Sequence, residues 1–128
     1  MKYANGRNFT ESENQVDIEL FYREKGSGEP LLLLHGNGES GAYFTHQMDY
    51  FQNKYRVIAP DTRGHGKSPR GEAPFTIAQF ACDLYDFIKV HRIPKAVILG
   101  FSDGANIAMQ FTMQHPDMVK ALILNGGN

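Results

Sequence analysis

The sequence G-F-S-D-G at residues 100–104 has residue types and a spacing suited to nucleophilic chemistry. The apolar run Ala96–Leu99 before it predicts a buried strand, and the segment from Asp103 to His115 predicts a helix. A G-x-S-x-G pattern between a strand and a helix is typical of a nucleophile elbow, a sharp turn that presents the serine hydroxyl to a cleft. We therefore predict that Ser102 is a nucleophile for acyl transfer, which would hydrolyse an ester, thioester, lactone or amide through an acyl-enzyme.

Two backbone N–H groups are expected to stabilise the negative charge that develops on an attacked carbonyl oxygen. The helix after Ser102 points its free N–H groups and the positive end of its dipole toward that oxygen, and the N–H of Asp103 is one candidate donor. The loop H-G-N-G at residues 35–38 lets the backbone approach the nucleophile. We assign the second donor to the N–H of Asn37, so that Asn37 and Asp103 would form an oxyanion hole.

Other roles for the elbow residues were weighed against these. Ser102 could serve as an N-cap at the start of the helix, because a serine is favoured there. The side chain of Asp103 is adjacent to the nucleophile and cannot reach behind a histidine, so only its backbone is expected to act. A carboxylate in the first turn of a helix is also stabilised by the helix dipole.

No histidine in the sequence is assigned as the general base. His35 and His65 lie in loops at strand ends, where they are expected to fix loop geometry. The other three, His46, His91 and His115, lie on predicted helices or at their ends. A serine hydroxyl without an adjacent base is a weak nucleophile, and the loss of one triad member costs several orders of magnitude in rate. We therefore expect an inactive or severely impaired catalyst.

The elements that must position these residues alternate along the chain. Continuous apolar runs predict four parallel core strands covered on both faces, at Leu31–Leu34, Val57–Ala59, Ala96–Leu99 and Ala121–Leu124. Apolar periodicity predicts helices at Thr76 to His91, Asp103 to His115 and, with a poorer period, Gly41 to Phe51. The imperfect alternation of Val16 to Tyr22 favours an antiparallel strand at the sheet edge. This order predicts a doubly wound, mostly parallel α/β sheet with flanking helices, where ligands bind at the carboxyl ends of the strands.

Composition excludes several classes of protein. The 128 residues allow one domain with a core, and their 13 basic and 14 acidic residues give a net charge near −1 without the basic block of a nucleic-acid binder. No apolar run approaches the roughly 18 residues of a membrane span. The single cysteine, Cys82, cannot form an internal disulfide, and the polar N-terminus lacks a signal peptide, so a cytoplasmic location is expected. No metal cluster and no cofactor is predicted.

A dinucleotide-binding site is the competing interpretation of the glycine-rich loop. Gly36, Gly38 and Gly41 satisfy G-x-G-x-x-G between a predicted strand and a predicted helix. Asp61 lies 20 residues further on, where such a fingerprint places the carboxylate that binds a ribose. The Ser102 elbow has no role in that fold, which argues against this alternative.

The motifs H-G-N-G, D-T-R-G-H-G-K-S at residues 61–68 and G-F-S-D-G together resemble the α/β-hydrolase fold family, in its esterase and lipase-like branch. The resemblance spans about residues 16 to 128 and implies hydrolysis of a small carboxylic ester or similar acyl compound through Ser102, without a cofactor. It also implies that the four apolar runs are strands three to six of that fold. Arg63, His65 and Lys67 could touch substrate, but a solvated or loop-stabilising role is favoured.

The resemblance further implies parts that this sequence does not contain. Members of the family continue with a cap, a seventh strand followed by the acid and an eighth followed by the catalytic histidine. We therefore interpret residues 1–128 as the N-terminal part of one hydrolase domain. An apolar last strand would then have an open edge, so we expect self-association or pairing with the missing C-terminal part. A non-catalytic binding protein on the same fold is the remaining alternative.

Overall fold

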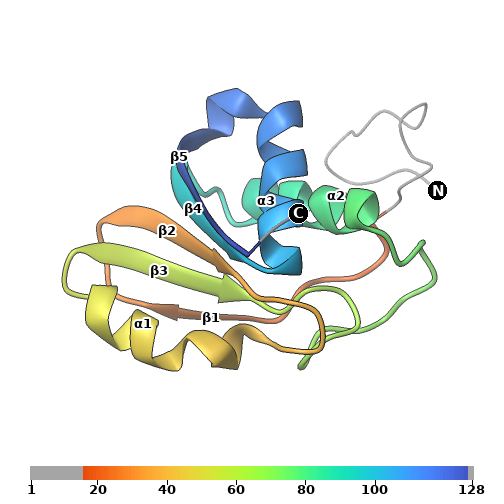
Figure 1. The fold of residues 1–128 in the computed structure, drawn as a ribbon, viewed down its shortest axis with the longest axis horizontal. Coiled ribbons are helices and arrows are strands. Elements are labelled where there is room, and N and C mark those ends of the chain that lie inside the picture. Colours follow the sequence, from red (N-terminus) through yellow and green to blue (C-terminus); the bar gives the residue numbers. More distant parts are fainter. Residues whose placement is uncertain (1–15, 127–128) are drawn as a thin grey trace.

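The computed structural model describes residues 16–126 and forms one five-stranded sheet flanked by helices (Figure 1). The strands are ordered β1-β3-β2-β4-β5 across the sheet. Their bounds are Tyr22–Lys25 for β1, Glu29–Leu34 for β2, Tyr55–Pro60 for β3, Ala96–Phe101 for β4 and Val119–Asn125 for β5. The α-helices are α1 at Thr45–Phe51, α2 at Ile77–Val90 and α3 at Asp103–Gln114, with single 3₁₀ turns η2 at Gly41–Phe44 and η3 at Pro116–Met118.

The sheet is parallel except at one edge. β2 pairs in parallel with β3 and with β4, β4 pairs in parallel with β5, and only β1 is antiparallel to its neighbour β3. All five residues from Pro30 to Leu34 are buried, which fits an apolar strand covered on both faces. The four predicted apolar runs are therefore confirmed as strands, and all carboxyl ends of the parallel strands lie at the same edge.

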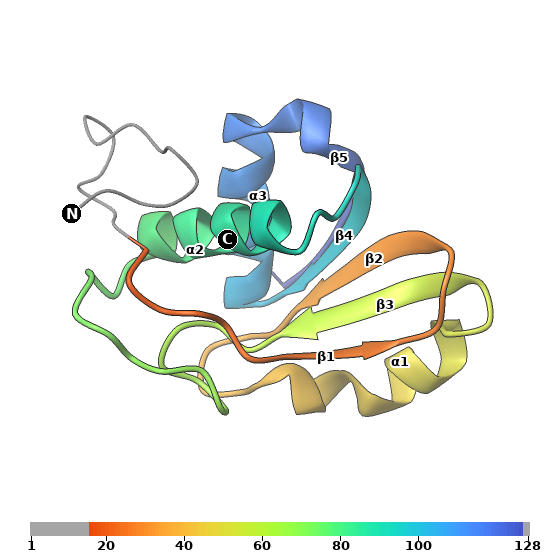
Figure 2. The same ribbon diagram turned by 180° about the vertical axis from the view of Figure 1, so that it is seen from behind.

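Helices cover both faces of the sheet, as the doubly wound interpretation requires. Figure 2 shows α1 on one side of the strands and α2 with α3 on the other. The larger core cluster joins α2 and α3 to the sheet and includes Leu32, Ile58, Ile98, Phe87 and Phe111. A smaller cluster joins α1 and η2 to the opposite face and includes Leu31, Leu33, Val57, Phe44 and Met48. Alternate residues of the same strands thus face different helices.

The predicted helices are present with nearly the predicted bounds. In α2, the hydroxyl of Thr76 accepts a hydrogen bond from the Gln79 N–H at 3.1 Å and caps the helix. The poorer apolar period over Gly41 to Phe51 has a structural cause. Its first turn is the 3₁₀ turn η2, and only Thr45–Phe51 forms an α-helix.

The sequence correctly predicted an antiparallel edge strand, but its predicted position, Val16 to Tyr22, is wrong. The antiparallel edge strand is Tyr22–Lys25, and the residues before it are not in a strand. The backbone of Phe21 is instead held by a loop, because its N–H donates to Ser68 Oγ at 2.9 Å and its carbonyl accepts from the Asp61 N–H at 2.8 Å. These two bonds satisfy the backbone N–H and carbonyl of Phe21, which in a strand would bond to a neighbouring strand.

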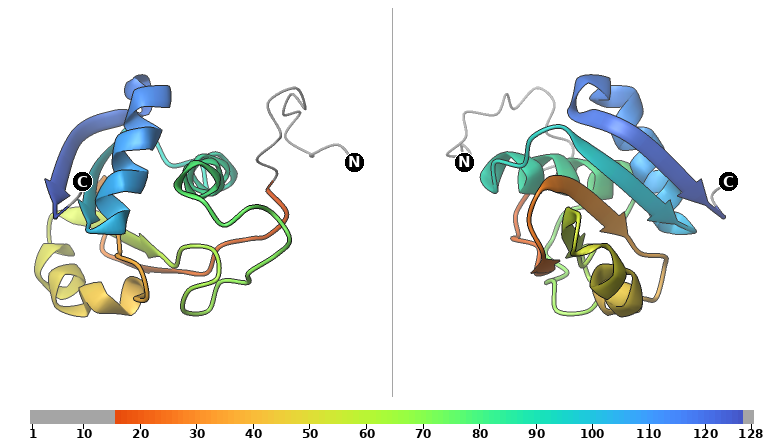
Figure 3. Two further views of the ribbon diagram at one scale, coloured as in Figure 1. Left: turned by 45° about the vertical axis from the view of Figure 1, so that its right-hand side comes forward. Right: turned by 90° about the vertical axis from the view of Figure 1, so that its left-hand side faces the viewer.

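The strand β5 departs from the expectation of a core strand covered on both faces. Figure 3 shows it at the edge of the sheet, next to β4. Of its seven residues, five are exposed, including Ile123 and Leu124, whose exposed fractions are 49% and 41%. The apolar run Ala121–Leu124 is part of a strand because β5 pairs with β4. The described residues nevertheless leave most of the side chains of β5 exposed.

Candidate active site

Ser102 occupies a sharp turn between β4 and α3. It has φ 58° and ψ −121°, a left-handed backbone conformation that costs a residue with a Cβ of the order of 1–3 kcal/mol. Its hydroxyl makes no capping hydrogen bond to the start of α3. The N-cap alternative therefore finds no support in the structure, and the strained geometry is that of an elbow.

The two flanking glycines are required by close packing at the elbow. A Cβ at Gly100 would lie 2.4 Å from the carbonyl oxygen of Gly104, and a Cβ at Gly104 would lie 2.1 Å from the carbonyl oxygen of Leu34. Both distances are far below van der Waals contact, and both neighbours are backbone atoms. The strand and helix can therefore meet at Ser102 only if both positions lack a side chain.

The loop after β2 lies against the elbow. A Cβ at Gly36 would lie 3.0 Å from the Cβ of Ser102, so this loop approaches Ser102 as the sequence predicted. Asn37 and Asp103 line one small cavity together with Gly36 and His65. Asp103 is the first residue of α3, where a backbone N–H has no partner within the helix. Donation by the N–H groups of Asn37 and Asp103 to an oxyanion stays a prediction.

The carboxyl end of β5 is also tied to the elbow. The Ser102 N–H donates to the carbonyl oxygen of Asn125 at 2.8 Å. Gly126, the next residue, lies close enough that a Cβ on it would be 3.8 Å from the Ser102 nitrogen. Ser102 is therefore surrounded by the ends of β2, β4 and β5, the edge at which an α/β sheet binds ligands.

Asp61 is the centre of a buried hydrogen-bond network. Its carboxylate accepts from Arg23 Nη1 at 2.8 Å, from the Gly41 N–H at 2.7 Å and from the Lys67 N–H at 2.9 Å. It is completely buried, and its carbonyl oxygen accepts from Ser68 Oγ. This carboxylate holds together the loops after β2 and β3 and has no surface to offer a ribose, which removes the dinucleotide alternative.

Arg63 is buried rather than solvated, which corrects one of its expected roles. Its guanidinium forms a bidentate salt bridge with Asp83, in which the Nε–Oδ2 and Nη2–Oδ1 distances are both 2.8 Å. It also forms an ion pair with Asp17 at 2.7 Å. Burial alone would lower the pKa of Arg63, but the bonds to Asp83 and Asp17 outweigh it and raise that pKa. Burial raises the pKa of Asp83, and hydrogen bonds from Arg63 and Gln79 offset this only in part. This network fixes the loop after β3 to α2.

Sequence reasoning missed Asp83 and Asp17 as members of this network. A signal was present for Asp83, because it is a carboxylate on the side of α2 that is buried and, apart from Gln79, apolar. A buried carboxylate calls for a cationic partner. No comparable signal marked Asp17, which lies in an irregular segment.

His35 is fully engaged in holding its own loop. The Thr62 N–H donates to His35 Nε2 at 3.0 Å, so Nδ1 carries the proton and donates to the Gly36 carbonyl oxygen at 2.7 Å. Only 1% of the residue is exposed, and this burial lowers its pKa, which favours the neutral ring. With both ring nitrogens occupied, His35 is structural, as its strand-end position suggested.

The second loop histidine, His65, lies against the loop at residues 35–38. His65 Nδ1 is 3.0 Å from the carbonyl oxygen of Arg63, and His65 Nε2 is 3.4 Å from Asn37 Oδ1. Neither His65 nor His35 is hydrogen-bonded to Ser102 Oγ. His46 lies in α1, and His91 and His115 directly follow α2 and α3. Of the described histidines, His65 contacts Asn37, and both His35 and His65 line the small cavity that contains Asn37 and Asp103.

Residues 29–128 match the family described as the alpha/beta hydrolase fold, and this chain belongs to that family. An uncharacterized protein of Mycobacterium tuberculosis is 37% identical over 80% of this chain. The 2-hydroxy-6-oxo-6-(2'-aminophenyl)hexa-2,4-dienoic acid hydrolase of Metapseudomonas resinovorans is 33% identical over 88%. Among solved structures, a marine microorganism esterase matches 84% of the chain with 40% identity and a TM-score of 0.81.

The chain is shorter than all three of these proteins. It covers 30% and 40% of the two curated relatives and 41% of the marine esterase. The match includes every motif described above, because it extends from β2 past Ser102. Hydrolase-named relatives support hydrolysis as the general chemistry of the family. In the described residues, 16–126, no helix has the length and apolar character to cross a membrane.

Proposed function

We propose that this chain carries the nucleophile and the oxyanion hole of a serine hydrolase that acts on carboxylic esters or similar acyl compounds. The observation that carries the proposal is the strained backbone of Ser102 between two glycines that no other residue could replace. Such strain persists at functional sites because the surrounding structure imposes it. The names of the marine esterase and of the dienoic acid hydrolase support an acyl or related carbonyl substrate.

In the proposed reaction, Ser102 Oγ attacks the substrate carbonyl carbon and its proton passes to a base. The negative charge that develops on the carbonyl oxygen is stabilised by hydrogen bonds that the N–H groups of Asn37 and Asp103 donate to it. The alcohol then leaves with a proton, and water releases the acid from the acyl-enzyme. Since neither His35 nor His65 bonds to Ser102 Oγ, we propose that this chain alone turns over slowly and that the base comes from outside the described residues.

Covalent labelling with a fluorophosphonate tests this proposal. Ser102 Oγ should displace fluoride from phosphorus, which adds one phosphonyl group to the chain in a mass spectrum. Imidazole in solution can act as an external base, so we expect it to accelerate labelling. Ser102→Ala should remove the adduct, and peptide mapping should place it at residue 102.

One observation favours the non-catalytic alternative, namely the lack of a histidine hydrogen-bonded to Ser102 Oγ in the described structure. A folded sample that gains no adduct even with imidazole would overturn the hydrolase proposal in favour of a binding protein. Equal labelling of the native chain and of Ser102→Ala would overturn it as well. A fast adduct without imidazole would instead mean that a base is supplied within the chain, against the proposed slow turnover.

A further inference from the structure

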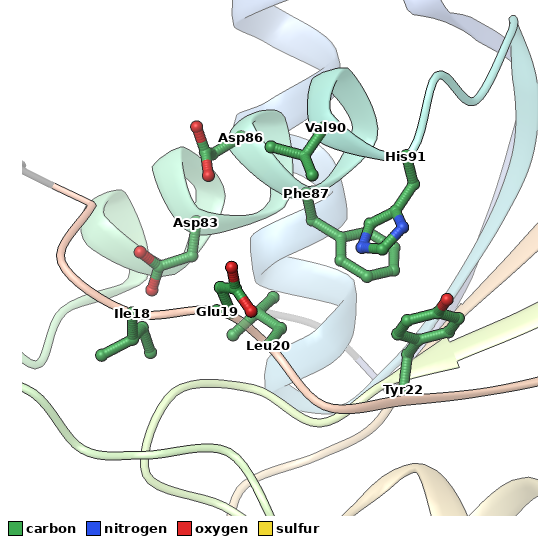
Figure 4. A pocket seen from close by; sticks show the side chains of 9 residues that line it. All are labelled: Ile18, Glu19, Leu20, Tyr22, Asp83, Asp86, Phe87, Val90 and His91. Atoms are coloured by element: carbon green, nitrogen blue, oxygen red, sulfur yellow. The ribbon is translucent and has the colours of Figure 1, made fainter. Parts of the chain in front are cut away.

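A second hollow lies between the segment before β1 and the helix α2, and we call it the α2 groove (Figure 4). Its walls come from residues 18–22 and from one side of α2 between Asp83 and His91. Its volume is about 150 Å³, which is about the size of a cavity that holds one benzene ring. None of its lining residues belongs to the elbow or to the loops around Ser102. The groove is therefore separate from the proposed active site.

One wall of the α2 groove is apolar and rigid. Leu20, Phe87 and Val90 line it, and 59% of Val90 is exposed, so apolar surface is available to a ligand. The ring of Tyr22 meets Phe87 edge-on at 5.2 Å between centroids and meets His91 at 4.7 Å. These contacts hold the rings in place before a ligand arrives, which lowers the entropic cost of binding.

The rim of the α2 groove carries negative charge. Glu19, Asp83 and Asp86 all line it, and none of its nine lining residues is a lysine or an arginine. Asp83 is compensated by the buried Arg63. Glu19 is exposed, and within residues 16–126 no ion pair involves its carboxylate. In Figure 4 this carboxylate points toward α2, between Asp83 and Phe87.

We propose that the α2 groove binds a small organic cation, an ammonium group attached to an aromatic or branched apolar body. The apolar body would cover the exposed surface of Val90 and release water from it, which is the favourable term for such surfaces. The ammonium group would lie near Glu19 and the aromatic rings, which attract a cation through charge and through the ring quadrupole. An anion is repelled by the Glu19 carboxylate, and a neutral analogue lacks this attraction.

Titration of the ¹⁵N-labelled chain with benzyltrimethylammonium, followed by NMR, tests the proposal. We expect saturable shifts of the backbone amides of residues 18–22 and 83–91. Benzyl alcohol should bind at least about tenfold more weakly, a difference of about 1.4 kcal/mol, and benzoate more weakly still. Because binding is read from these amides and not from Ser102 labelling, its failure is distinguishable from failure of the proposed hydrolase function.

Two variants of the groove make the test specific. Val90→Lys places a competing cation in the groove at an exposed helical position and should lower the affinity at least about tenfold. Glu19→Gln removes one charge with little change of shape and should lower it by a smaller factor. Met113→Lys is the matched control, because Met113 is an apolar residue of α3 with 82% exposure outside the groove. It should bind as the native chain does.

Three outcomes would overturn the proposal. The first is an absence of saturable shifts in the native chain. The second is binding of benzyl alcohol or benzoate as tight as that of the cation. The third is an affinity that neither Glu19→Gln nor a folded Val90→Lys variant changes, with folding judged by the dispersion of the remaining amide signals.

Discussion

Gly36 lies so close to Ser102 that a Cβ on Gly36 would be 3.0 Å from the Ser102 Cβ. The loop after β2 and the elbow after β4 are thus in contact at Ser102, although Gly36 and Ser102 are 66 positions apart in sequence. The same Cβ would lie 3.1 Å from a Glu39 carboxylate oxygen and 3.4 Å from the Phe101 carbonyl oxygen. A side chain at position 36 would therefore press on the elbow from the side of the expected oxyanion hole.

Gly36→Ala should slow the imidazole-assisted labelling of Ser102 by about tenfold, since a displacement of a reacting group by about 1 Å can cost that much or more. The rate of adduct formation in the mass spectrum measures the effect. Gly38→Asn is the control, because nothing lies within 4 Å of a Cβ at Gly38 and asparagine tolerates its positive φ of 80°. If Gly36→Ala is labelled as fast as this control, the close contact between Gly36 and Ser102 does not affect the reactivity of Ser102, which would contradict the prediction.

Ser102→Gly should stabilise the fold by about 1 kcal/mol, because glycine accepts φ 58° without strain. The added freedom of glycine in the unfolded chain offsets only part of this gain. Ser102→Ala retains the Cβ and should leave the free energy of unfolding within about 0.5 kcal/mol of the native value. Urea denaturation compares the two, and equal stabilities would show that the elbow stores no such strain.

Asp83→Asn should destabilise the chain by about 3 kcal/mol or more, because it removes the buried charged partner of the Arg63 guanidinium and leaves only the more exposed Asp17. Replacing both residues, with Arg63→Met and Asp83→Leu, should recover much of the loss. A double-mutant cycle of urea unfolding energies measures this coupling. If the loss of unfolding free energy in the double variant equals the sum of the losses in the two single variants, Arg63 and Asp83 are not energetically coupled, and the prediction is refuted.

His35 should make the fold less stable at acid pH. Its burial lowers the pKa of the folded state, whereas the unfolded chain takes up a proton near the ordinary value of 6.5. Below that pH the unfolded state binds more protons, so the free energy of unfolding falls as pH falls, by up to about 1.4 kcal/mol per pH unit. Above that value the contribution of His35 is constant.

The measurement is urea unfolding of the native chain and of His35→Gln at several pH values from 5 to 8. The variant should lose the acid-side slope that His35 contributes. His46→Gln, at an exposed position of α1, should keep it. A slope that His35→Gln leaves unchanged would assign the pH dependence to another group.

The open edge of β5 should make the chain associate with itself. Ile123 and Leu124 are half exposed, and among residues 16–126 only β4 pairs with this strand. An apolar edge with unpaired backbone groups readily accepts another strand. Sedimentation should show concentration-dependent association that Ile123→Lys weakens and that Tyr50→Lys, at an exposed position of α1, does not. A monomer at all concentrations would contradict this expectation.

Much of the fold could be read from local patterns. Buried parallel strands are continuous apolar runs, and α2 shows its apolar side at spacings of three and four, so both were found with nearly the right bounds. The position of β1 was not predictable in this way. Residues 16–21 carry a similar pattern, but the backbone of Phe21 bonds to Asp61 and Ser68, which are 40 and 47 positions away, and not to a strand.

By itself the sequence determined the elbow, because a buried strand, G-x-S-x-G and a helix occur in direct succession and the required contacts are local. It also determined which loops surround the nucleophile, since parallel strands place their carboxyl ends together. Only the tertiary structure decided what the charged residues of those loops do. In the sequence, Asp61 and Arg63 are both charged residues of a polar loop, yet in the structure both are completely buried. Backbone and side-chain donors compensate the charge of Asp61, and Asp83 compensates the charge of Arg63. Their roles depend on partners brought together by folding, because a buried charge is tolerated only where distant groups compensate it.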